Sequence, residues 1–424
     1  MSKKPSKPRV PKLRFPEFHD SGEWDNPSLG DISERLTAKV GDSALTPVSI
    51  SAGIGFVSQK EKFGRRIAGK QYKNYIILNK GDFSYNKGNS KKYPQGCVYK
   101  LKEFDQVAAP NAFISFRFKE GLVPDFYQGY FDSNYHGKQL IKFITSGARS
   151  DGLLNINADD FFSINLPTPK DKAEAPKIAA CLTSLDDLIR AHREKLQALQ
   201  DHKKGLLQQL FPAEGETVPK LRFPGFEGEW EEDRFGNLIK VVSGKGFKAS
   251  EYTNSGIRLL QIENVGYGLT KWGDKKVFLP KGYSIEHSNL VLKHGDIVLA
   301  LNRPITNDQL KIAQLTIHDT PSILYQRVGK LVIQSKSLNR DFAFYACQHF
   351  IKNFVIKGSI GSDQPFISLK ELYAQDFPLP TLPEQYKLTG ILSSIDTIIT
   401  SHTQQLAALQ THKKGLTQQL FPSD

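Results

Sequence analysis

The side chains best suited to chemistry in this sequence are basic and polar groups in glycine-containing loops that follow strand-like segments. The loop at 84–96, SYNKGNSKKYPQG, comes directly after the strand-like GDF and carries Asn86, Lys87, Lys91 and Lys92. Amide and ammonium groups bond to base edges, and lysines also bind backbone phosphates. The loop is therefore a candidate nucleic-acid contact, although a solvated hairpin loop would have the same composition.

A matching position exists in the second half of the chain. Asn302 and Arg303 follow the strand-like GDI much as Asn86 and Lys87 follow GDF, and arginine is the commonest specific partner of guanine. The segment 61–73 carries a cluster of lysines and arginines but no polar side chains held in fixed positions. Such a segment is more suited to contact with phosphates than to reading bases. Together with Arg303, the further candidates for DNA contact are Arg65, Arg66, Arg149, Lys245, Lys248 and Gln364. A structural turn is the alternative for the corresponding loops SGARSDG and GSIGSDQ, which carry Arg149 and Gln364.

No motif predicts catalysis by this chain. An amino-methyltransferase needs an Asn/Asp-Pro-Pro-aromatic loop and a glycine-rich cofactor loop. The nearest stretch, DQPF at 363–366, lacks the first proline, and no F-x-G-x-G accompanies it. The phosphate-binding pattern G-x-x-x-x-G-K-[ST] is also absent. The three cysteines lack metal-ligand spacing, and we expect reduced thiols at Cys97, Cys181 and Cys347. These observations predict a binding protein that holds no metal or cofactor.

Composition points to a nucleic-acid partner for a globular protein. The 424 residues are enough for two hydrophobic cores, and 39% of them are hydrophobic. Lysine and arginine number 57 against 44 acidic residues, which gives a net charge of +13 and favours an anionic partner. No apolar run is long enough to span a membrane. The basic start, MSKKPSKPRVPK, lacks the apolar region of a signal peptide, so we expect a cytoplasmic protein.

The chain contains an internal repeat. Residues 177–212 align without a gap on 387–422, and the copies end in HKKGLLQQLFP and HKKGLTQQLFP. A second pair, PKLRFPEF and PKLRFPGF, begins at 11 and 219. Joining the chain's ends would rebuild its internal junction, FPAEGETVPKLRFPGF. The repeat therefore predicts two tandem units with pseudo-two-fold symmetry and with the chain termini close together.

The copied segment has the spacing of a coiled-coil seam. Apolar residues recur at heptad positions, and His192 and His402 occupy the two gaps, where a polar residue can fix register. The seam residues are Leu182, Leu185, Ile189, Leu196, Leu199, Leu392, Ile395, Ile399, Leu406 and Leu409. We expect two helices of roughly 50 Å that pair antiparallel. Lys203 and Lys413 near their C-terminal ends would complement the helix dipoles.

The predicted fold class is α+β, with two tandem α/β domains, each followed by a long helix, and with the helices paired as an antiparallel coiled-coil spacer. Strand-like stretches such as FISFRF and GDIVLAL support sheets in both domains. The predicted organisation is a basic tail at 1–10, a domain at 11–170, a helix at 171–212, a linker at 213–218, a domain at 219–381 and a helix at 382–424.

Two inverted basic domains on such a rod are suited to duplex DNA, because they can meet successive major grooves on one face of the double helix. The domains differ in sequence, which predicts an asymmetric bipartite site. The near-copied helices, the PKLRFP segments and the two variable domains together resemble the specificity subunit of a type I restriction–modification system, over nearly the whole chain.

The resemblance implies a non-catalytic subunit whose target-recognition domains each read part of a bipartite DNA site. It also implies that the copied helices set the gap between half-sites and dock two methylation subunits, which carry S-adenosylmethionine. Restriction subunits with ATP-dependent translocase and nuclease activity would join them. The alternative is a stand-alone bipartite DNA-binding regulator without catalytic partners.

Overall fold

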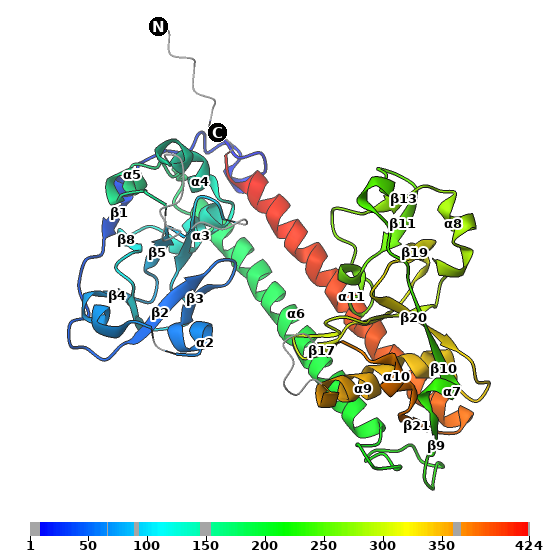
Figure 1. The fold of residues 1–424 in the computed structure, drawn as a ribbon. Helices are drawn as coiled ribbons and strands as arrows, with labels where there is room; N and C mark the ends of the chain where they lie inside the picture. Colours follow the sequence, from blue (N-terminus) through cyan, green and yellow to red (C-terminus); the bar gives the residue numbers. More distant parts are fainter. Residues whose placement is uncertain (1–8, 66, 89–92, 145–153, 359–365, 423–424) are drawn as a thin grey trace. The chain divides into compact units, whose positions relative to one another are not determined.

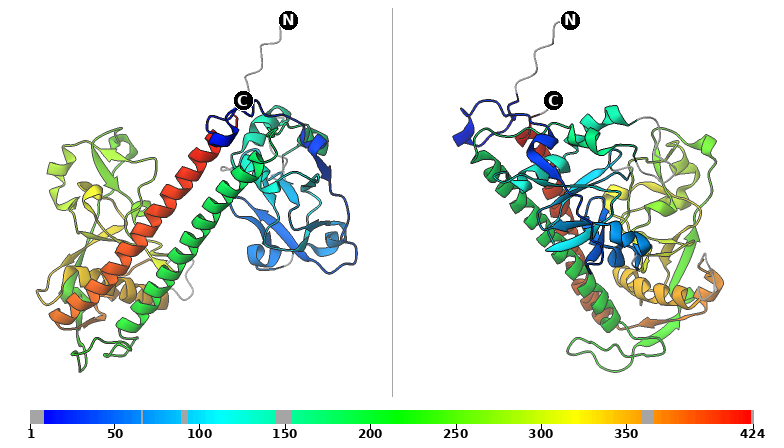
Figure 2. Two further views of the ribbon diagram at one scale, coloured as in Figure 1. Left: turned by 180° about the vertical axis from the view of Figure 1, so that it is seen from behind. Right: turned by 90° about the vertical axis from the view of Figure 1, so that its left-hand side faces the viewer.

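The computed structural model describes residues 9–65, 67–88, 93–144, 154–358 and 366–422 (Figure 1). The chain forms two compact units. Unit 1 is Met1–Glu194 with Thr403–Asp424, and unit 2 is Lys195–His402. Two long helices, α6 (Glu174–Leu210) and α11 (Leu382–Leu420), contribute to both units. Each unit thus combines one mixed α and β domain with part of each long helix, which confirms the predicted fold class (Figure 2).

The domain of unit 1 contains two four-stranded sheets, ordered β1-β8-β5-β6 and β3-β2-β7-β4. Its strands are β1 (Ser33–Arg35), β2 (Thr46–Ser51), β3 (Gly55–Ser58), β4 (Ile76–Asn79), β5 (Phe83–Asn86), β6 (Cys97–Lys100), β7 (Gln106–Ala109) and β8 (Ile114–Phe118). Its helices are α1 (Leu29–Ile32), α2 (Gln59–Phe63), α3 (Pro124–Asp132), α4 (Tyr135–Leu140) and α5 (Ala158–Phe162).

An aromatic core joins the first sheet of unit 1 to the long helices. Phe83 of β5 and Phe116 of β8 stack at 5.3 Å between ring centroids, and both are fully buried. Helix α3 packs closely on this core through Gly129. A Cβ atom at Gly129 would lie 2.6 Å from Leu182 Cδ1 of α6, so this close approach requires glycine.

The domain of unit 2 contains a five-stranded sheet, β10-β20-β15-β18-β12, a four-stranded sheet, β13-β11-β19-β14, and the two-stranded ribbons β16-β17 and β21-β9. Its strands are β9 (Glu231–Arg234), β10 (Ile239–Ser243), β11 (Ile257–Leu260), β12 (Tyr267–Gly268), β13 (Phe278–Leu279), β14 (Val291–Leu292), β15 (Ile297–Ala300), β16 (Ile305–Thr306), β17 (Gln309–Leu310), β18 (Ile312–Gln314), β19 (Ser322–Leu324), β20 (Val328–Ile333) and β21 (Asp376–Leu379). Its helices are α7 (Phe235–Leu238), α8 (Tyr283–Glu286), α9 (Arg340–Gly358) and α10 (Leu369–Tyr373).

The PKLRFP segment of each unit is tied to the start of a long helix by an ion pair, which is buried in unit 1 and partly buried in unit 2. In unit 1, Arg14 donates two hydrogen bonds to the Glu174 carboxylate, each 2.7 Å long, and Trp24 Nε1 donates a third. The two side chains of the ion pair are 4% and 0% exposed. An arginine fork matches the geometry of a carboxylate, so the contact is directional as well as charged. We call this arrangement the Arg–Glu–Trp clamp.

The same clamp recurs in unit 2. Arg222 donates to both oxygens of Glu384 at 2.8 and 2.9 Å, and Trp230 Nε1 lies 3.3 Å from the same carboxylate. Each PKLRFP segment also bonds to the end of the other long helix of its unit. Leu13 N donates to Gln419 O in unit 1, and Leu221 N donates to Gln209 O in unit 2. The chain's first and last described segments therefore meet within unit 1.

The long helices run antiparallel within each unit, and lysines from the repeated HKKG sequence fix their register. In unit 1, Lys413 near the end of α11 bonds to Asp186 of α6 at 2.6 Å and to Asp132 of α3. In unit 2, Lys203 near the end of α6 bonds to Asp396 of α11 at 2.7 Å. These lysine side chains are only 15% and 13% exposed. Both lysines are therefore largely buried partners of carboxylates, and their interaction with the helix dipoles stays a prediction.

The predicted seam residues are buried to different degrees. Leu182, Ile189 and Leu392 are buried. The half-buried members of the seam are Leu185, Leu196, Leu199, Ile395, Ile399, Leu406 and Leu409. Leu182 belongs to the hydrophobic core of unit 1 and Leu392 to that of unit 2, so domain side chains account for their burial.

Candidate nucleic-acid interface

One end of the large sheet of unit 2 gathers exposed cations from three neighbouring strands. Strands β10, β20 and β15 lie side by side, with Ser243 paired to Gly329 and Ala300 paired to Val328 at this end. Lys245 follows β10 and Arg303 follows β15. Arg327 precedes β20 and is bonded through its carbonyl to Leu301 N. The structure thus brings together Lys245 and Arg303, which the sequence predicted separately. It adds Arg327, which no motif indicated.

The backbone at this sheet end is held in an uncommon conformation. Arg303 and Arg327 have φ values of +46° and +66°, in the left-handed region that side chains other than glycine seldom adopt. Such residues cluster at ligand contacts, where the surrounding structure fixes them. Neither arginine forms an ion pair with a described carboxylate, and both are exposed. The two guanidinium groups are therefore available to an anionic ligand.

The turn that follows Arg303 is anchored to the long helix α6. Strands β16 and β17 form a hairpin whose two loop residues, Asn307 and Asp308, both have positive φ, as in a tight type I′ turn. The Asp308 carboxylate accepts a hydrogen bond from Lys204 of α6 at 2.8 Å and pairs with Lys352 of α9. Bonding to Lys204 and Lys352 lowers the pKa of Asp308 to about 2. This anchor restricts the movement of the adjoining Arg303 segment.

The second predicted basic loop of unit 2, 243–252, packs against α8. Phe247 lies 5.9 Å from Tyr283 between ring centroids, and the Tyr283 hydroxyl bonds to Glu251. The backbone N–H of Lys248 also donates to Glu251, which keeps the loop compact while the Lys248 side chain remains exposed. Gln364 lies outside the described residues. The segment after it returns beside Arg303, because Ile367 N donates to Leu301 O.

Unit 1 brings its two predicted contact segments together at the end of β2. Lys62 of α2 donates to Ile50 O at 2.8 Å, and Asn86 Nδ2 approaches the same carbonyl at 3.5 Å. Asn86 Oδ1 also accepts a hydrogen bond from Gly88 N, so its side chain stabilises the turn that starts the loop. The Lys87 carbonyl accepts from Leu154 N, which corresponds to the contact between Leu301 and Ile367 in unit 2.

The remaining predicted contacts of unit 1 are only partly described. Arg65 is exposed directly after Gly64, whose φ of +69° ends α2 in a left-handed cap. The candidates outside the described residues are Arg66, Lys91, Lys92 and Arg149. DNA contact by any of the candidates, in either unit, stays a prediction.

A buried histidine supports the same sheet in unit 1. His136 of α4 is 1% exposed and lies edge-on to Tyr85 of β5, with 6.3 Å between ring centroids. Its ring nitrogens have no hydrogen-bond partner among the described residues. Burial lowers the pKa of His136 to about 4, so the ring is neutral at physiological pH. Tyr85 in turn donates to Gln95 O and holds the end of the predicted contact loop.

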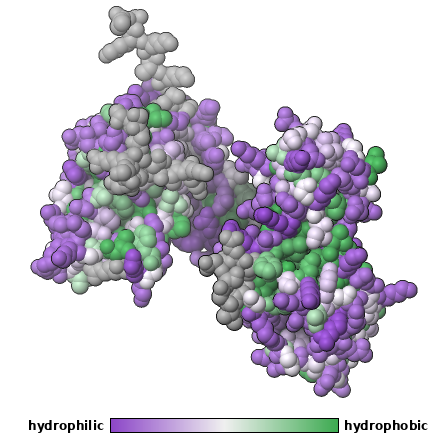
Figure 3. All heavy atoms as spheres, viewed as in Figure 1, coloured by the Kyte–Doolittle hydropathy of each residue, from purple (hydrophilic) through white to green (hydrophobic). Residues whose placement is uncertain are grey.

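The described residues contain no cluster of three or more histidine, cysteine or acidic side chains arranged to hold a metal ion. Within the same part of the chain, no helix combines the length and hydrophobicity needed to cross a membrane. Hydrophilic side chains dominate the face of each unit seen in Figure 3.

Comparison with known proteins identifies the family. Residues 227–411 match the model of the type I restriction modification DNA specificity domain. The MjaVIII specificity subunit of Methanocaldococcus jannaschii is 34% identical over 286 residues, which cover 66% of this chain and 67% of that protein. The EcoAI specificity subunit of Escherichia coli is 32% identical over 228 residues, covering 54% of this chain and 37% of that protein.

The fold is also that of a known crystal structure. The S subunit of a type I restriction–modification system from M. genitalium matches with a TM-score of 0.57 at 16% identity, covering 98% of this chain and 100% of that chain. The present chain belongs to the specificity subunits of type I restriction–modification systems. This confirms the resemblance that was based on the repeated helices and the PKLRFP segments.

Proposed function

We propose that this chain recognises an asymmetric bipartite site in double-stranded DNA, with one domain reading each half. The observation that carries the proposal is the group of exposed cations at the end of the β10-β20-β15 sheet. There, Arg303 is positioned to read a base, because a guanidinium bonds to both acceptors of guanine. Lys245, Lys248 and Arg327 surround it as phosphate contacts that set orientation without reading sequence.

In unit 1, the corresponding surface is the end of β5. Lys87 and Arg65 supply charge beside the loop that carries Lys91 and Lys92. The Asn86 side chain already supports the loop's first turn, so we assign it a positioning role and leave contact with DNA to its neighbours. We propose 11–170 and 219–381 as the two target-recognition domains.

Substitution of Arg303 tests this assignment. Arg303→Ala should weaken binding of a duplex that carries the site by about 10- to 100-fold, and it should relax the preference at one base pair. The matched control is Lys336→Ala. It removes the same charge from an exposed residue after the opposite end of β20. Equal losses in both variants, with unchanged base preference, would show that Arg303 contributes only general charge.

We further propose that the chain is non-catalytic and that two methylation subunits, which carry S-adenosylmethionine, dock on its long helices. Restriction subunits would join that assembly. The support is a surface that the two copies of the helix share. LQALQDHKKGLLQQLFP and LAALQTHKKGLTQQLFP differ at only three aligned pairs of positions. The exposed residues common to both copies are Ala198 and Ala408, Gln200 and Gln410, His202 and His412, Lys204 and Lys414, Gln208 and Gln418, and Gln209 and Gln419.

Two glycines within this shared surface are not explained by packing against any residue that the structure describes. Gly205 and Gly415 lie within α6 and α11, where glycine costs about 1 kcal/mol of helix stability relative to alanine. A Cβ atom at either position would meet no atom of the described residues within 4 Å. Close approach of another polypeptide accounts for both, because only glycine leaves the helix backbone uncovered.

In unit 1, the shared surface borders an open groove of about 470 Å³. Its lining residues are Leu188, His192, Gln405, Ala408, Leu409 and His412. Leu188 is 43% exposed although it is apolar, and the aligned residue of the second copy, Ile398, is also 43% exposed. A surface that appears once in each unit would bind two identical partners in the same way.

Glycine substitution separates docking from folding. Gly415→Met fills open space, so it should leave the chain folded and raise helix stability by up to about 1 kcal/mol. It should nevertheless remove one of the two methylation subunits, and Gly205→Met with Gly415→Met should remove both. Gly390→Met is the control, since that glycine also faces open space but is aligned with Ala180. Native mass spectrometry of the co-expressed subunits measures the stoichiometry. A two-subunit complex with the double variant would contradict the docking surface.

A further inference from the structure

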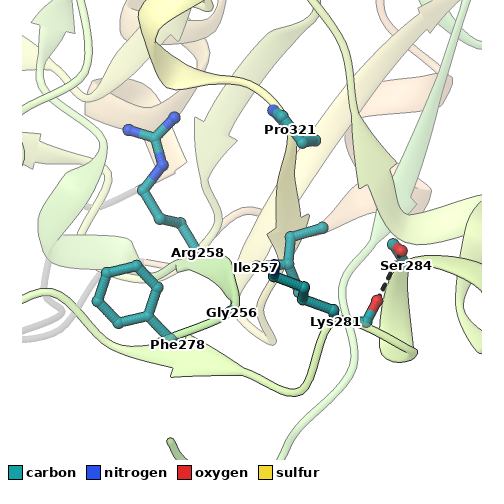
Figure 4. A pocket seen from close by; sticks show the side chains of 7 residues that line it. All are labelled: Gly256, Ile257, Arg258, Phe278, Lys281, Ser284 and Pro321. Carbon is teal, nitrogen blue, oxygen red and sulfur yellow. Dashed lines mark hydrogen bonds between the residues drawn. The ribbon is translucent and has the colours of Figure 1, made fainter. Parts of the chain in front are cut away.

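A pocket of about 410 Å³ opens in unit 2 between β11, β13, α8 and the segment that leads into β19 (Figure 4). It is lined by Gly256, Ile257, Arg258, Phe278, Lys281, Ser284 and Pro321. Figure 4 shows Arg258 and Phe278 on one side of Ile257, and Lys281 and Ser284 on the other. Among the described residues, the lining contains two cations and no carboxylate, so the pocket favours a negatively charged ligand.

The arginine of this pocket is held in place before any ligand binds. Its guanidinium lies 4.8 Å from the centroid of the Trp272 ring, and Nη2 donates to His318 O at 2.6 Å. Trp272 is itself fixed, because its Nε1 donates at 2.8 Å to Asp319, a residue that is only 5% exposed. Stacking and one hydrogen bond thus fix the plane of the guanidinium, while its other N–H groups have no carboxylate partner among the described residues.

The pocket adjoins the basic loop already assigned to DNA. Tyr283, the residue before the pocket-lining Ser284, packs against Phe247 of that loop. The loop that carries Lys245 and Lys248 and the pocket that contains Lys281 and Arg258 therefore both contact α8. Lys275 and Lys276 add exposed charge in the segment before β13, where Asp274 is the nearby exposed acid.

We propose that this pocket binds a backbone phosphate of the DNA, with Arg258 as the main contact and Lys281 as the second. The inference rests on the proposed function. A fixed guanidinium fork suits a phosphodiester, and Phe278 and Pro321 give the apolar wall against which a deoxyribose can lie. A contact of this kind positions the duplex and contributes equally to all sequences.

The test measures duplex binding by the full chain as a function of salt. Arg258→Ala should weaken binding about 10-fold, for target and unrelated sequences alike. It should also reduce the slope of log K against log salt by about 0.9, the value for one phosphate. Lys281→Ala, a change at an exposed residue that disturbs no core, should act in the same direction. Lys336→Ala is the control and should leave the slope unchanged.

A neutral methylphosphonate placed at single linkages of the duplex then locates the contact. At one linkage, the methylphosphonate should weaken duplex binding by the wild-type chain as much as Arg258→Ala does. The same modified duplex should bind the Arg258→Ala variant no more weakly than the unmodified duplex does. Titration with a free deoxynucleoside monophosphate should show no comparable affinity, and tight binding would instead make the pocket a nucleotide site. If the wild-type chain does not bind duplex, the proposed function itself fails. If it binds and both pocket variants retain its slope, only the pocket assignment is overturned.

Discussion

The Arg–Glu–Trp clamp gives a sharp prediction about what holds each unit together. Glu174→Gln keeps the shape of the side chain but removes its charge. Arg14, whose side chain is 4% exposed, would then stay buried without a carboxylate. Trp24 would retain only a neutral acceptor. The clamp joins the start of the domain to the start of α6, so we expect unit 1 to lose stability.

The size of the effect follows from burial. Removing one partner of a buried ion pair costs about 3–5 kcal/mol, because the remaining charge is uncompensated. A domain of this size loses about 2–4 °C in its unfolding midpoint for each kcal/mol, so the midpoint of unit 1 should fall by roughly 6–20 °C. Glu384→Gln in unit 2 should produce a loss there as well, and a smaller one, because the Arg222 side chain is 15% exposed.

Native-state hydrogen exchange is the suitable assay, because it reports the opening of each unit separately. Glu174→Gln should increase exchange in the strands of unit 1 and leave those of unit 2 unchanged, and Glu384→Gln should do the reverse. Glu194→Gln, in an exposed part of α6, is the control for the loss of one negative charge. A loss below about 1 kcal/mol in both clamp variants would refute the reasoning, since an ion pair exposed to water contributes only that much.

Three further predictions follow from the structure. Because burial lowers the pKa of His136 to about 4, the unfolded chain takes up a proton between pH 6.5 and 4 while the folded chain does not. The stability of unit 1 should therefore fall by about 3 kcal/mol as pH drops through that range, and His136→Leu should remove this dependence in pH-resolved denaturant unfolding. Leu185→Asp with Ile395→Asp, at half-buried seam positions, should abolish assembly with methylation subunits in co-purification; retained assembly would exclude the seam's role. Exchange of residues 1–170 for another such domain should change one half of the methylated sequence, and a change in both halves would contradict independent domains.

The sequence predicted those features that repeat or that have a local period. The seam of α6 and α11 was visible because heptad spacing is local. The partners of Arg14 were not, because Glu174 is 160 positions away and no period connects them. The sequence did contain a signal for this contact. Both PKLRFP segments are followed by GEW, and a glutamate stands near the start of each long helix. The spacing between the two GEW copies, and between the two glutamates, is close to the spacing of the internal repeat.

The candidate nucleic-acid interface was likewise predicted only in part. Lys245 and Arg303 were candidates because each sits in a loop of suitable composition. Their proximity depends on the strand order β10-β20-β15, which is not readable from one sequence. Arg327 and Arg258 were missed for the same reason. Each is an isolated arginine beside strand residues, and only tertiary structure reveals its environment.

The central claim is that this chain directs methylation to an asymmetric bipartite DNA site. The most direct measurement is single-molecule sequencing of modified bases in DNA from cells that express this chain together with a methylation subunit of its own system. Cells with the methylation subunit alone provide the comparison. We predict a split, asymmetric methylated motif that appears only when this chain is present. Methylation that is unchanged by its removal, with the methylation subunit expressed in both cases, would contradict the account.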